Sequence, residues 1–378
     1  MLHVAVLFEF PTRNGGENSM LALLRQLSGS DFQFTAIAPA DGPLADELRR
    51  LKIPLVPFCV RAAGVKRSPE ILHTELTSIV KNIRPDILHA NSLSMARLTG
   101  QLNLPDGVAR TGHLRDIIKL NRTVIADLNS NDGLIAVSAA TKQFHVRQGL
   151  NSDHCRVIHN GIDGKLFAAV STDRQALRAE FFPNVARPTA QSSLKIILNV
   201  GQICLRKGQL LLAEAVCRLL ERRDDIALLI VGERHSAKKE SVQYEQQIRQ
   251  TFADAGRDSH LHLTGYRTDI ADVMNASDVL VQSSHQEPFG RVLLEAAASQ
   301  LPIVATDVGG TAEMLHHNDH ALLVPPASLD ELTEAIAQTI DASDEAVSRA
   351  ISAQDRIVQQ FDIRKTVQQT AEFWQQHG

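Results

Sequence analysis

Two glutamates, Glu287 and Glu295, flank a break in the chain made by Pro288, Phe289 and Gly290, and seven residues separate them. Proline fixes its own φ, and glycine lets the backbone come close to a ligand. After the break, apolar residues recur at helical spacing, which predicts a helix whose N-terminus faces an open loop. Such a terminus offers unpaired N–H groups and about half a positive charge, which suits a phosphate. Alone, Glu295 would be a solvated helix residue; together, both carboxylates could face one ligand.

A second loop carries two cations. Arg206 and Lys207 lie between Gly201 and Gly208, directly after an expected strand at 195–200. Two cations beside two glycines suit a phosphate clamp, because the backbone can approach the ligand while the charges neutralise it. The alternative for this loop by itself is a pair of exposed basic side chains.

The first half of the chain holds weaker signals. Gly15 and Gly16 stand between an expected strand and an expected helix, although any turn of that kind can use glycine. His113 follows an expected strand end, where ligands of α/β proteins bind, and Arg115 beside it is the fallback candidate for an anion contact. A lone histidine is more often structural than catalytic, so His113 needs a second argument.

Short apolar runs alternate with helical patterns along the whole chain, and this alternation predicts an α/β fold with parallel sheets. The expected strands are 4–8, 32–38, 53–56, 86–89, 134–137, 195–200, 226–231, 261–264, 279–281, 302–305 and 322–326. The expected helices include 44–51, 69–83, 291–298, 329–350 and 361–376.

Composition sets the broad class. The 378 residues, 44% apolar and 22% charged, are enough for two domains with full cores. A net charge of −4 gives no general attraction to nucleic acid. The four cysteines are too scattered for a metal or redox pair, and we expect them to be reduced.

Two features of the sequence bear on contact with a membrane. The chain starts without a basic leader and never reaches 18 continuous apolar residues, so we expect a cytoplasmic protein. A locally basic region of the first half would suit an anionic acceptor or the inner membrane face, and the alternative is a solvated surface. Its residues are Arg49, Arg50, Lys52, Arg61, Lys66 and Arg67.

The stretch around the two glutamates carries a family resemblance. The motif E-P-F-G-x-x-x-L-E-A at 287–296, followed by L-P-I-V-A-T-D-V-G-G at 301–310, resembles the donor-site signature of the retaining glycosyltransferases of family four. The resemblance implies the GT-B fold, which has two Rossmann-like domains facing across a cleft. We therefore expect an N-terminal, acceptor-side domain at 1–165 and a nucleotide-sugar-binding domain at 166–361. The last helix, 362–378, is expected to pack back on the first domain.

The resemblance also assigns roles to residues. Glu287 is placed near the transferred sugar, Glu295 at the ribose, and Lys207 at the donor diphosphate. Gln202 stands where the family has arginine, and Arg206 is the candidate substitute. The predicted catalytic residues are Glu287, His113 and Lys207. The predicted donor-binding residues are Gly15, Gly16, Arg206, Lys207, Gly232, Tyr266, Arg267, Phe289, Gly290, Arg291 and Glu295.

His113 is assigned beside the donor sugar by the same resemblance, although His-Leu-Arg-Asp replaces the commoner His-Asp here. Gly15 and Gly16 match a G-G-x-E loop that approaches the donor phosphates. Tyr266 and Arg267 match the loop near the nucleotide base.

The implied activity is transfer of a hexosyl unit from a UDP- or GDP-sugar to a glycan, lipid or small molecule. No cofactor and no metal are expected, because the chain has no D-x-D pair. Three alternatives remain. An epimerase of similar fold would consume the donor without an acceptor. A nicotinamide oxidoreductase would need G-x-G-x-x-G after a strand, which is absent. A non-catalytic nucleotide-sugar-binding protein would be expected to lack Glu287, Glu295 and Lys207.

Overall fold

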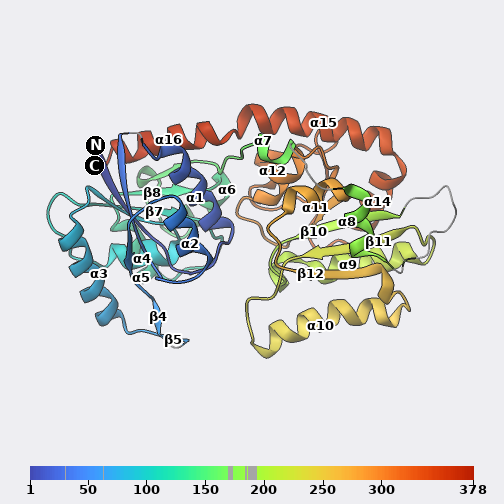
Figure 1. Cartoon of the computed structure of the whole chain (residues 1–378), viewed down its shortest axis with the longest axis horizontal. Helices are drawn as coiled ribbons and strands as arrows, with labels where there is room; N and C mark the ends of the chain where they lie inside the picture. Colours follow the sequence, from blue (N-terminus) through green and yellow to red (C-terminus); the bar gives the residue numbers. More distant parts are fainter. Residues whose placement is uncertain (30, 63, 169–172, 184, 186–193) are drawn as a thin grey trace. The chain divides into compact units, whose positions relative to one another are not determined.

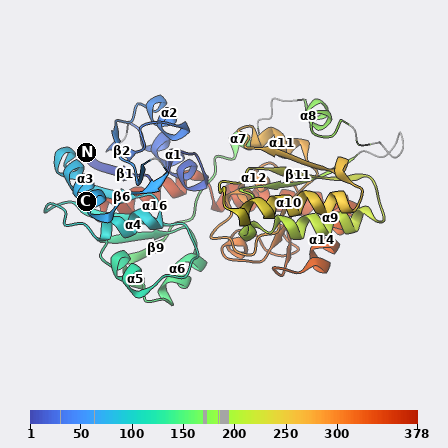
Figure 2. The ribbon, with the colours of Figure 1, turned by 90° about the horizontal axis from the view of Figure 1, so that it is seen from below.

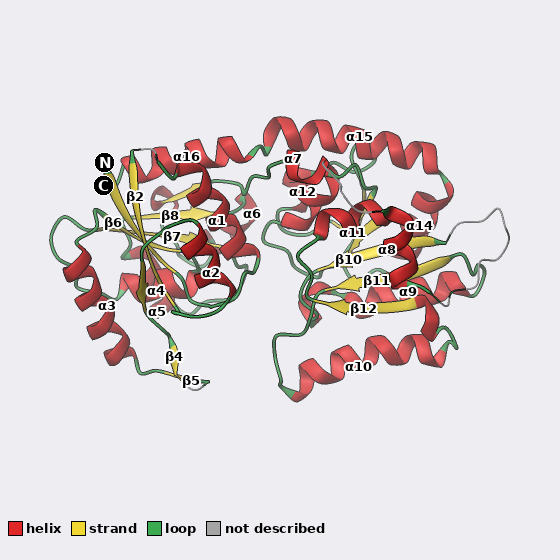
Figure 3. Cartoon of the chain, in the orientation of Figure 1, coloured by secondary structure: helices red, strands yellow, loops and turns green. Residues whose placement is uncertain are grey.

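The computed structural model of the chain describes residues 1–378 except 30, 63, 169–172, 184 and 186–193 (Figure 1). By their contacts these residues form two compact units, Met1–Gly161 with Ile363–Gly378, and Ile162–Asp362. Each unit is a parallel sheet with helices on both faces (Figure 3). The second unit begins before the expected residue 166, because Ile162 N–H donates to Phe361 O at 2.8 Å and joins that unit.

The first unit contains a sheet of seven strands. Its strands are β1 (Leu2–Leu7), β2 (Phe32–Ala38), β3 (Leu55–Pro57), β6 (Ile87–Ala90), β7 (Ala109–Leu114), β8 (Gly133–Ala136) and β9 (Cys155–Val157). All pair in parallel, in the order β3-β2-β1-β6-β7-β8-β9. A separate hairpin consists of β4 (Arg61–Ala62) and β5 (Val65–Lys66).

The helices of the first unit are α1 (Gly15–Leu27), α2 (Pro43–Arg50), α3 (Pro69–Ile83), α4 (Leu93–Gly100), α5 (Arg122–Asn129), α6 (Ala139–Val146), the short η1 (Ser152–His154) and α16 (Ile363–Gln375). Several begin at a polar cap; Ser92, Asn121 and Ser138 each accept a hydrogen bond from the first turn. One apolar cluster joins α3, α4 and α5 to the sheet, and another joins α1, α2 and α16. The first unit is therefore a three-layer sandwich.

The second unit has a sheet of six strands: β10 (Lys195–Val200), β11 (Ile226–Val231), β12 (Leu261–Gly265), β13 (Val279–Gln282), β14 (Ile303–Thr306) and β15 (Leu322–Val324). They pair in parallel in the order β12-β11-β10-β13-β14-β15. Strands β10 and β11 are fully apolar at their centres, as expected for strands covered on both faces.

The helices of the second unit are α7 (Lys165–Ala168), α8 (Arg174–Phe181), η2 (Leu205–Lys207), α9 (Gln209–Leu220), α10 (Lys239–Asp254), η3 (Asp258–His260), α11 (Ile270–Ala276), α12 (Arg291–Ala298), α13 (Thr311–Met314), α14 (Leu329–Asp341) and α15 (Ser343–Gln360). Helices α10, α9 and α14 lie side by side against one face of the sheet (Figure 2). The single helix expected at 329–350 is wrong. The backbone leaves helical geometry at Ala342, and Asp344 and Glu345 then favour a new helix start.

Each sheet has a point where the direction of winding reverses. Strand β1 lies between β2 and β6, and β10 lies between β11 and β13. Loops that follow the two central strands leave the carboxyl edge in opposite directions, and ligands of such folds bind there. No helix in the described part of the chain is long and apolar enough to cross a membrane.

Candidate functional site

Lys207 and Glu287 meet at the winding reversal of the second sheet. Lys207 follows β10, Glu287 follows β13, and Lys207 Nζ lies 2.5 Å from Glu287 Oε2. The side chains are only 15% and 9% exposed, so solvent screens this pair little. Gln282 Nε2 donates to the same carboxylate oxygen at 3.1 Å, and Arg206 Nη1 stands 3.8 Å from it. The structure thus brings the predicted cations and Glu287 together.

Backbone contacts between the two loops hold this pair in place. The hydroxyl of Ser283 donates to the carbonyl oxygens of Lys207 and Gly208, and His285 N–H donates to Arg206 O at 2.9 Å. Gly208 has a φ of +66°, and a Cβ there would lie 2.0 Å from Ser283 O. Only glycine fits at that position.

The glycine before α12 is required for a similar reason. Gly290 has a φ of +96°, and a Cβ there would lie 3.2 Å from both Glu287 Cγ and Gln282 Nε2. On the other side of this turn, Gly310 N–H donates to Glu287 O at 3.2 Å. The N-terminus of α12 and the backbone of Glu287 are therefore positioned by the same two glycines.

Glu295 lies in the second turn of α12 beside Arg291, which donates to its carboxylate at 3.2 Å. Burial raises the pKa of Glu295 above its ordinary value, and the charge of Arg291 opposes that rise. A partly buried carboxylate with one charged partner can accept further hydrogen bonds, such as those from a vicinal diol.

The other predicted residues of this unit are less closely joined. The Phe289 side chain is 2% exposed and packs 5.9 Å from the ring of Phe361, so only its backbone could meet a ligand. Gly232 packs directly against Gly201. Tyr266 is 53% exposed. Arg267 donates to Asp269 and Glu180, and the structure does not bring it to the Lys207–Glu287 pair within the described residues.

In the first unit, Gly15 and Gly16 form the N-terminus of α1. Asn14 N–H donates to the Glu17 carboxylate at 3.1 Å, which closes a capping box around the two glycines. A Cβ on Gly16 would lie 3.0 Å from Cδ of Arg115, so the absence of a side chain lets the arginine pass beneath the loop.

Arg115 joins three loops at the carboxyl edge of the first sheet. Its guanidinium donates to the backbone oxygen and the Oδ1 of Asn91 at 3.0 Å each, and to Oδ1 of Asn160 at 3.1 Å. A cation is thereby fixed next to the N-terminus of α1, where the helix dipole already favours anions.

The expectation that His113 follows a strand end is wrong. His113 lies within β7 and is 3% exposed, because the strand continues through the buried Leu114. His113 Nδ1 lies 2.7 Å from Nε2 of His89. Burial, Arg115 and His89 together hold the pKa of His113 well below its usual value, so the imidazole is neutral at pH 7.

Sequence reasoning missed several residues that shape these sites. They are Asn91, Asn160, His89, Trp374 and Gln282. Asn91 and Gln282 stand at strand ends of the reversal points, and that position could have singled them out. Trp374 lies far away in sequence, so no local pattern links it to His89.

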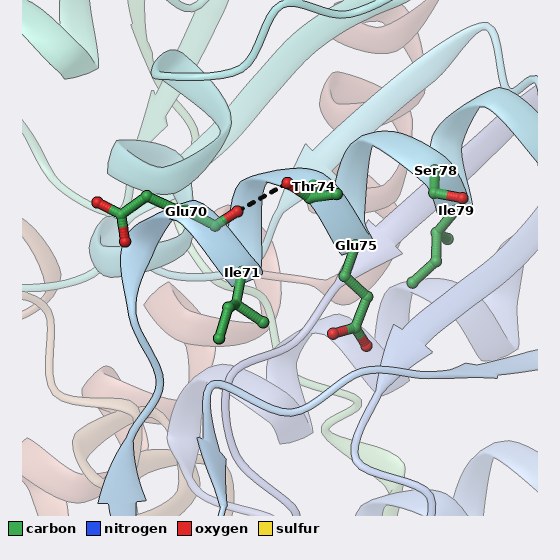
Figure 4. Close-up of a pocket in the computed structure, with 6 residues that line it drawn as sticks. All are labelled: Glu70, Ile71, Thr74, Glu75, Ser78 and Ile79. Carbon is green, nitrogen blue, oxygen red and sulfur yellow. Dashed lines mark hydrogen bonds between the residues drawn. The ribbon is translucent and has the colours of Figure 1, made fainter.

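An open depression of about 480 Å³ lies along one side of α3 (Figure 4). Its lining residues are Glu70, Ile71, Thr74, Glu75, Ser78 and Ile79, none of them a predicted site residue. In the basic region nearby, Arg49, Arg50 and Arg67 pair with carboxylates, which reduces its net positive charge.

Two family models match most of the chain. The model described as Glycosyltransferase Family 4 matches residues 13–165, and that described as Glycosyl transferases group 1 matches residues 194–342. The chain belongs to glycosyltransferase family four. The family-four signature seen at 287–310 therefore lies in the matched region of the second unit.

Named relatives are similar over part of their length. The chain is 31% identical over 189 residues to mannosylfructose-phosphate synthase of Agrobacterium fabrum, covering 49% of this chain and 39% of that protein. It is 26% identical over 212 residues to the lipopolysaccharide core biosynthesis mannosyltransferase LpsB of Rhizobium meliloti, covering 56% of each. The matches thus span about half the length of these relatives.

Solved structures share this fold over the whole chain. Anabaena Alr3699/HepE in complex with UDP-glucose superimposes with a TM-score of 0.86 at 22% identity, covering 100% of both chains. Sucrose-phosphate synthase from Thermosynechococcus elongatus has a TM-score of 0.78 at 18% identity, covering 100% of this chain and 99% of that one. The fold is therefore GT-B.

Proposed function

We propose that this protein transfers a hexosyl unit, with retention at the anomeric carbon, from a nucleoside diphosphate sugar to an acceptor. The observation that carries the proposal is that Lys207 and Arg206 lie beside the carboxylate of Glu287, just before the N-cap of α12 at Gly290. A diphosphate leaving group needs fixed positive charge as the glycosidic bond breaks, and these groups supply it. Family membership and the UDP-glucose complex of the HepE structure support a nucleotide-sugar donor.

Each residue then has a definite task. Lys207 and Arg206 receive the charge that develops on the β-phosphate, and the N–H groups at Phe289–Arg291 add the field of the helix terminus. Glu287 loses Lys207 to the diphosphate and turns toward the transferred sugar. Glu295 accepts hydrogen bonds from the ribose hydroxyls.

We propose further that the reaction needs no divalent metal, because Lys207 and Arg206 can supply the positive charge that a metal would otherwise bring to the diphosphate. The acceptor is a glycan, a lipid or a small molecule. An anionic acceptor or membrane surface would meet the first unit at its remaining exposed cations, such as Arg61 and Lys66.

Thermal unfolding with UDP, GDP and ADP, followed by incubation with the matching sugar nucleotides, tests the proposal. A ligand at 100 times its Kd stabilises the folded state by about 2.7 kcal/mol. We expect one nucleotide to raise Tm and its sugar to be hydrolysed slowly without acceptor. Recovery of an epimerised sugar would favour the epimerase instead, and stabilisation without any turnover would favour a binding protein.

A further inference from the structure

Three buried rings form a hydrogen-bonded chain that starts on the C-terminal helix. Trp374 on α16 donates its indole N–H to Nδ1 of His89 at 3.1 Å, and Nε2 of His89 lies 2.7 Å from Nδ1 of His113. Trp374 and His89 are fully buried. The ring centroids are 5.2 Å and 4.9 Å apart along the chain, with edge-to-face geometry.

The indole fixes the protons of both histidines. Indole N–H can only donate, so Nδ1 of His89 must accept and its proton must sit on Nε2. That proton is donated to Nδ1 of His113, which leaves the His113 proton on Nε2. The Thr111 hydroxyl, 2.8 Å from the same nitrogen of His89, can donate or accept and therefore does not decide the tautomer.

Both rings are neutral, so each must choose one tautomer. Burial and the nearby charge of Arg115 lower the pKa of His89 to about 3, and the same causes act on His113. Protonation of either ring at neutral pH would add a second cation next to Arg115 without a buried counter-charge among the groups that act on them.

The outer nitrogen of His113 is open to a ligand. Some polar side-chain atoms of the described residues are fully buried and have no hydrogen-bond partner, but Nε2 of His113 is not one of them. No described hydrogen bond involves this nitrogen either, so it belongs to the small part of His113, 3% of the residue, that is exposed.

We propose that Trp374 and His89 are positioning residues that hold His113 as an Nε2–H hydrogen-bond donor. The oxygen it serves belongs to the donor sugar, and this part of the inference rests on the proposed function. A residue of the C-terminal helix α16 thus determines which ring nitrogen of His113, in β7, carries the proton. If Nδ1 of His89 were protonated instead, two N–H groups would face each other in a dry site.

Long-range ¹H–¹⁵N spectra of histidine-labelled full-length protein, recorded without substrate, test the tautomers directly. A protonated ring nitrogen and an unprotonated one have well-separated ¹⁵N shifts, and His113→Gln and His89→Gln identify the signals. We expect Nε2–H on both rings. An Nδ1–H tautomer of His113 in the wild-type protein would overturn the inference, whatever the activity of the protein.

Substitutions then test the cause. Trp374→Phe keeps an aromatic ring against Phe32 and Phe34 but removes the N–H, and we expect His113 to become a mixture of tautomers. His89→Leu should release His113 in the same way. His89→Gln, whose amide can both accept and donate, should restore the Nε2–H form. If the His113 spectrum were unchanged in both Trp374→Phe and His89→Leu, neither residue would control the tautomer of His113 and the inference would be refuted.

Turnover gives the functional readout. We expect kcat to fall by about 2- to 10-fold in Trp374→Phe and in His89→Leu, the usual worth of one neutral hydrogen bond, with recovery in His89→Gln. If the tautomers of His113 changed but kcat did not, a hydrogen bond from His113 to the donor sugar would be refuted. The control of the His113 tautomer by Trp374 and His89 would still stand. Absence of all transferase activity in the wild type would instead refute the proposed function.

Discussion

The ammonium group of Lys207 is bound to Glu287 in the structure, although the proposed reaction needs it at a diphosphate. The two demands are compatible, because a diphosphate carries more negative charge than one carboxylate and would compete for the cation. A buried pair of this kind contributes little net stability, since the cost of removing both charges from water offsets their attraction. In the proposed reaction, its value is to keep a cation in place before the donor binds.

Substitution of Lys207 by alanine is expected to lower kcat by about 10²–10³-fold, the usual cost of removing a group that stabilises transition-state charge. Nucleotide affinity should fall less, because the charge on the leaving group is greatest in the transition state. Steady-state kinetics with a UDP binding assay measures both. A near-normal kcat would mean that the N-terminus of α12 or Arg206, and not Lys207, stabilises the charge of the leaving group.

The loss of Lys207 also strands Glu287 in a largely buried place, so a double variant is the necessary control. Lys207→Ala with Glu287→Gln removes the stranded charge. Because the two residues touch, the two effects should not add. If the double variant recovered the kcat of Glu287→Gln alone, Lys207 would serve only to neutralise Glu287.

The two glutamates should separate in their kinetics. Glu295→Gln is expected to raise the donor KM by about 10-fold, because it weakens a charged hydrogen bond that is made equally in the ground state and in the transition state. Glu287→Gln is expected to lower kcat by a similar factor or more. Glu214→Gln, on the exposed side of α9, is the matched control. Unchanged kcat and KM in both variants would contradict the site assignment.

Burial of Glu295 predicts a pH effect on stability. Its pKa in the folded protein is raised, so between the unfolded and folded pKa values the native state binds more protons, and stability falls as pH rises. Glu295→Gln removes that loss. Chemical denaturation should therefore show the variant gaining stability relative to wild type at pH 7 compared with pH 4. Parallel pH curves for the two proteins would contradict the burial argument.

At the scale of elements, the loops after β10 and β13 work as one unit because Gly208 lets them touch. Gly208→Ala should cost about 1–2 kcal/mol for a left-handed Cβ and about 1–3 kcal/mol more for the contact with Ser283 O. Separating the loops would also draw Lys207 from Glu287 and weaken nucleotide binding.

Gly256 after α10 is the matched control for that substitution. Its φ of +63° is close to that of Gly208, but a Cβ there meets nothing within 4 Å. Gly256→Ala should therefore show the backbone cost alone and bind nucleotide normally. Equal losses of Tm in the two variants would mean that the contact of the new Cβ with Ser283 O costs no stability, and would contradict the requirement for glycine at position 208.

Sequence patterns predicted those elements best whose cores are continuous and apolar. The expected strands 32–38, 195–200 and 226–231 coincide with β2, β10 and β11. Strand β7 runs past the strand end expected before His113, and its bounds were hard to predict because Arg110, Thr111 and His113 interrupt its apolar pattern. Thr111 Oγ1 and His113 Nδ1 find their partner in His89 of the neighbouring strand β6, which no local pattern shows.

At the scale of the molecule, the sequence predicted two α/β units, the last helix joining the first of them, and the GT-B fold. The Lys207–Glu287 contact could be anticipated, since both residues follow strands that a reversed winding makes neighbours. The engagement of Arg267 by Glu180 could not, because their 87-residue separation carries no period or motif. Sequence patterns can therefore predict which residues lie at strand ends. They do not predict which distant side chains these residues pair with, because that depends on packing.

Metal ions are expected not to be required for turnover. In a metal-dependent transferase a divalent cation bound by acidic residues neutralises the diphosphate. The proposed reaction gives this task to Lys207 and Arg206, which lie beside Glu287. Turnover should therefore continue in EDTA, with kcat within about twofold of the untreated enzyme. One group in the described chain, His316, Asp319 and His320, has potential ligand atoms within 4.8 Å of one another. His316→Ala is the control for any metal effect from there. Loss of turnover in EDTA that Mg²⁺ or Mn²⁺ restores, in this variant as in wild type, would contradict the assignment of the leaving-group charge to Lys207 and Arg206.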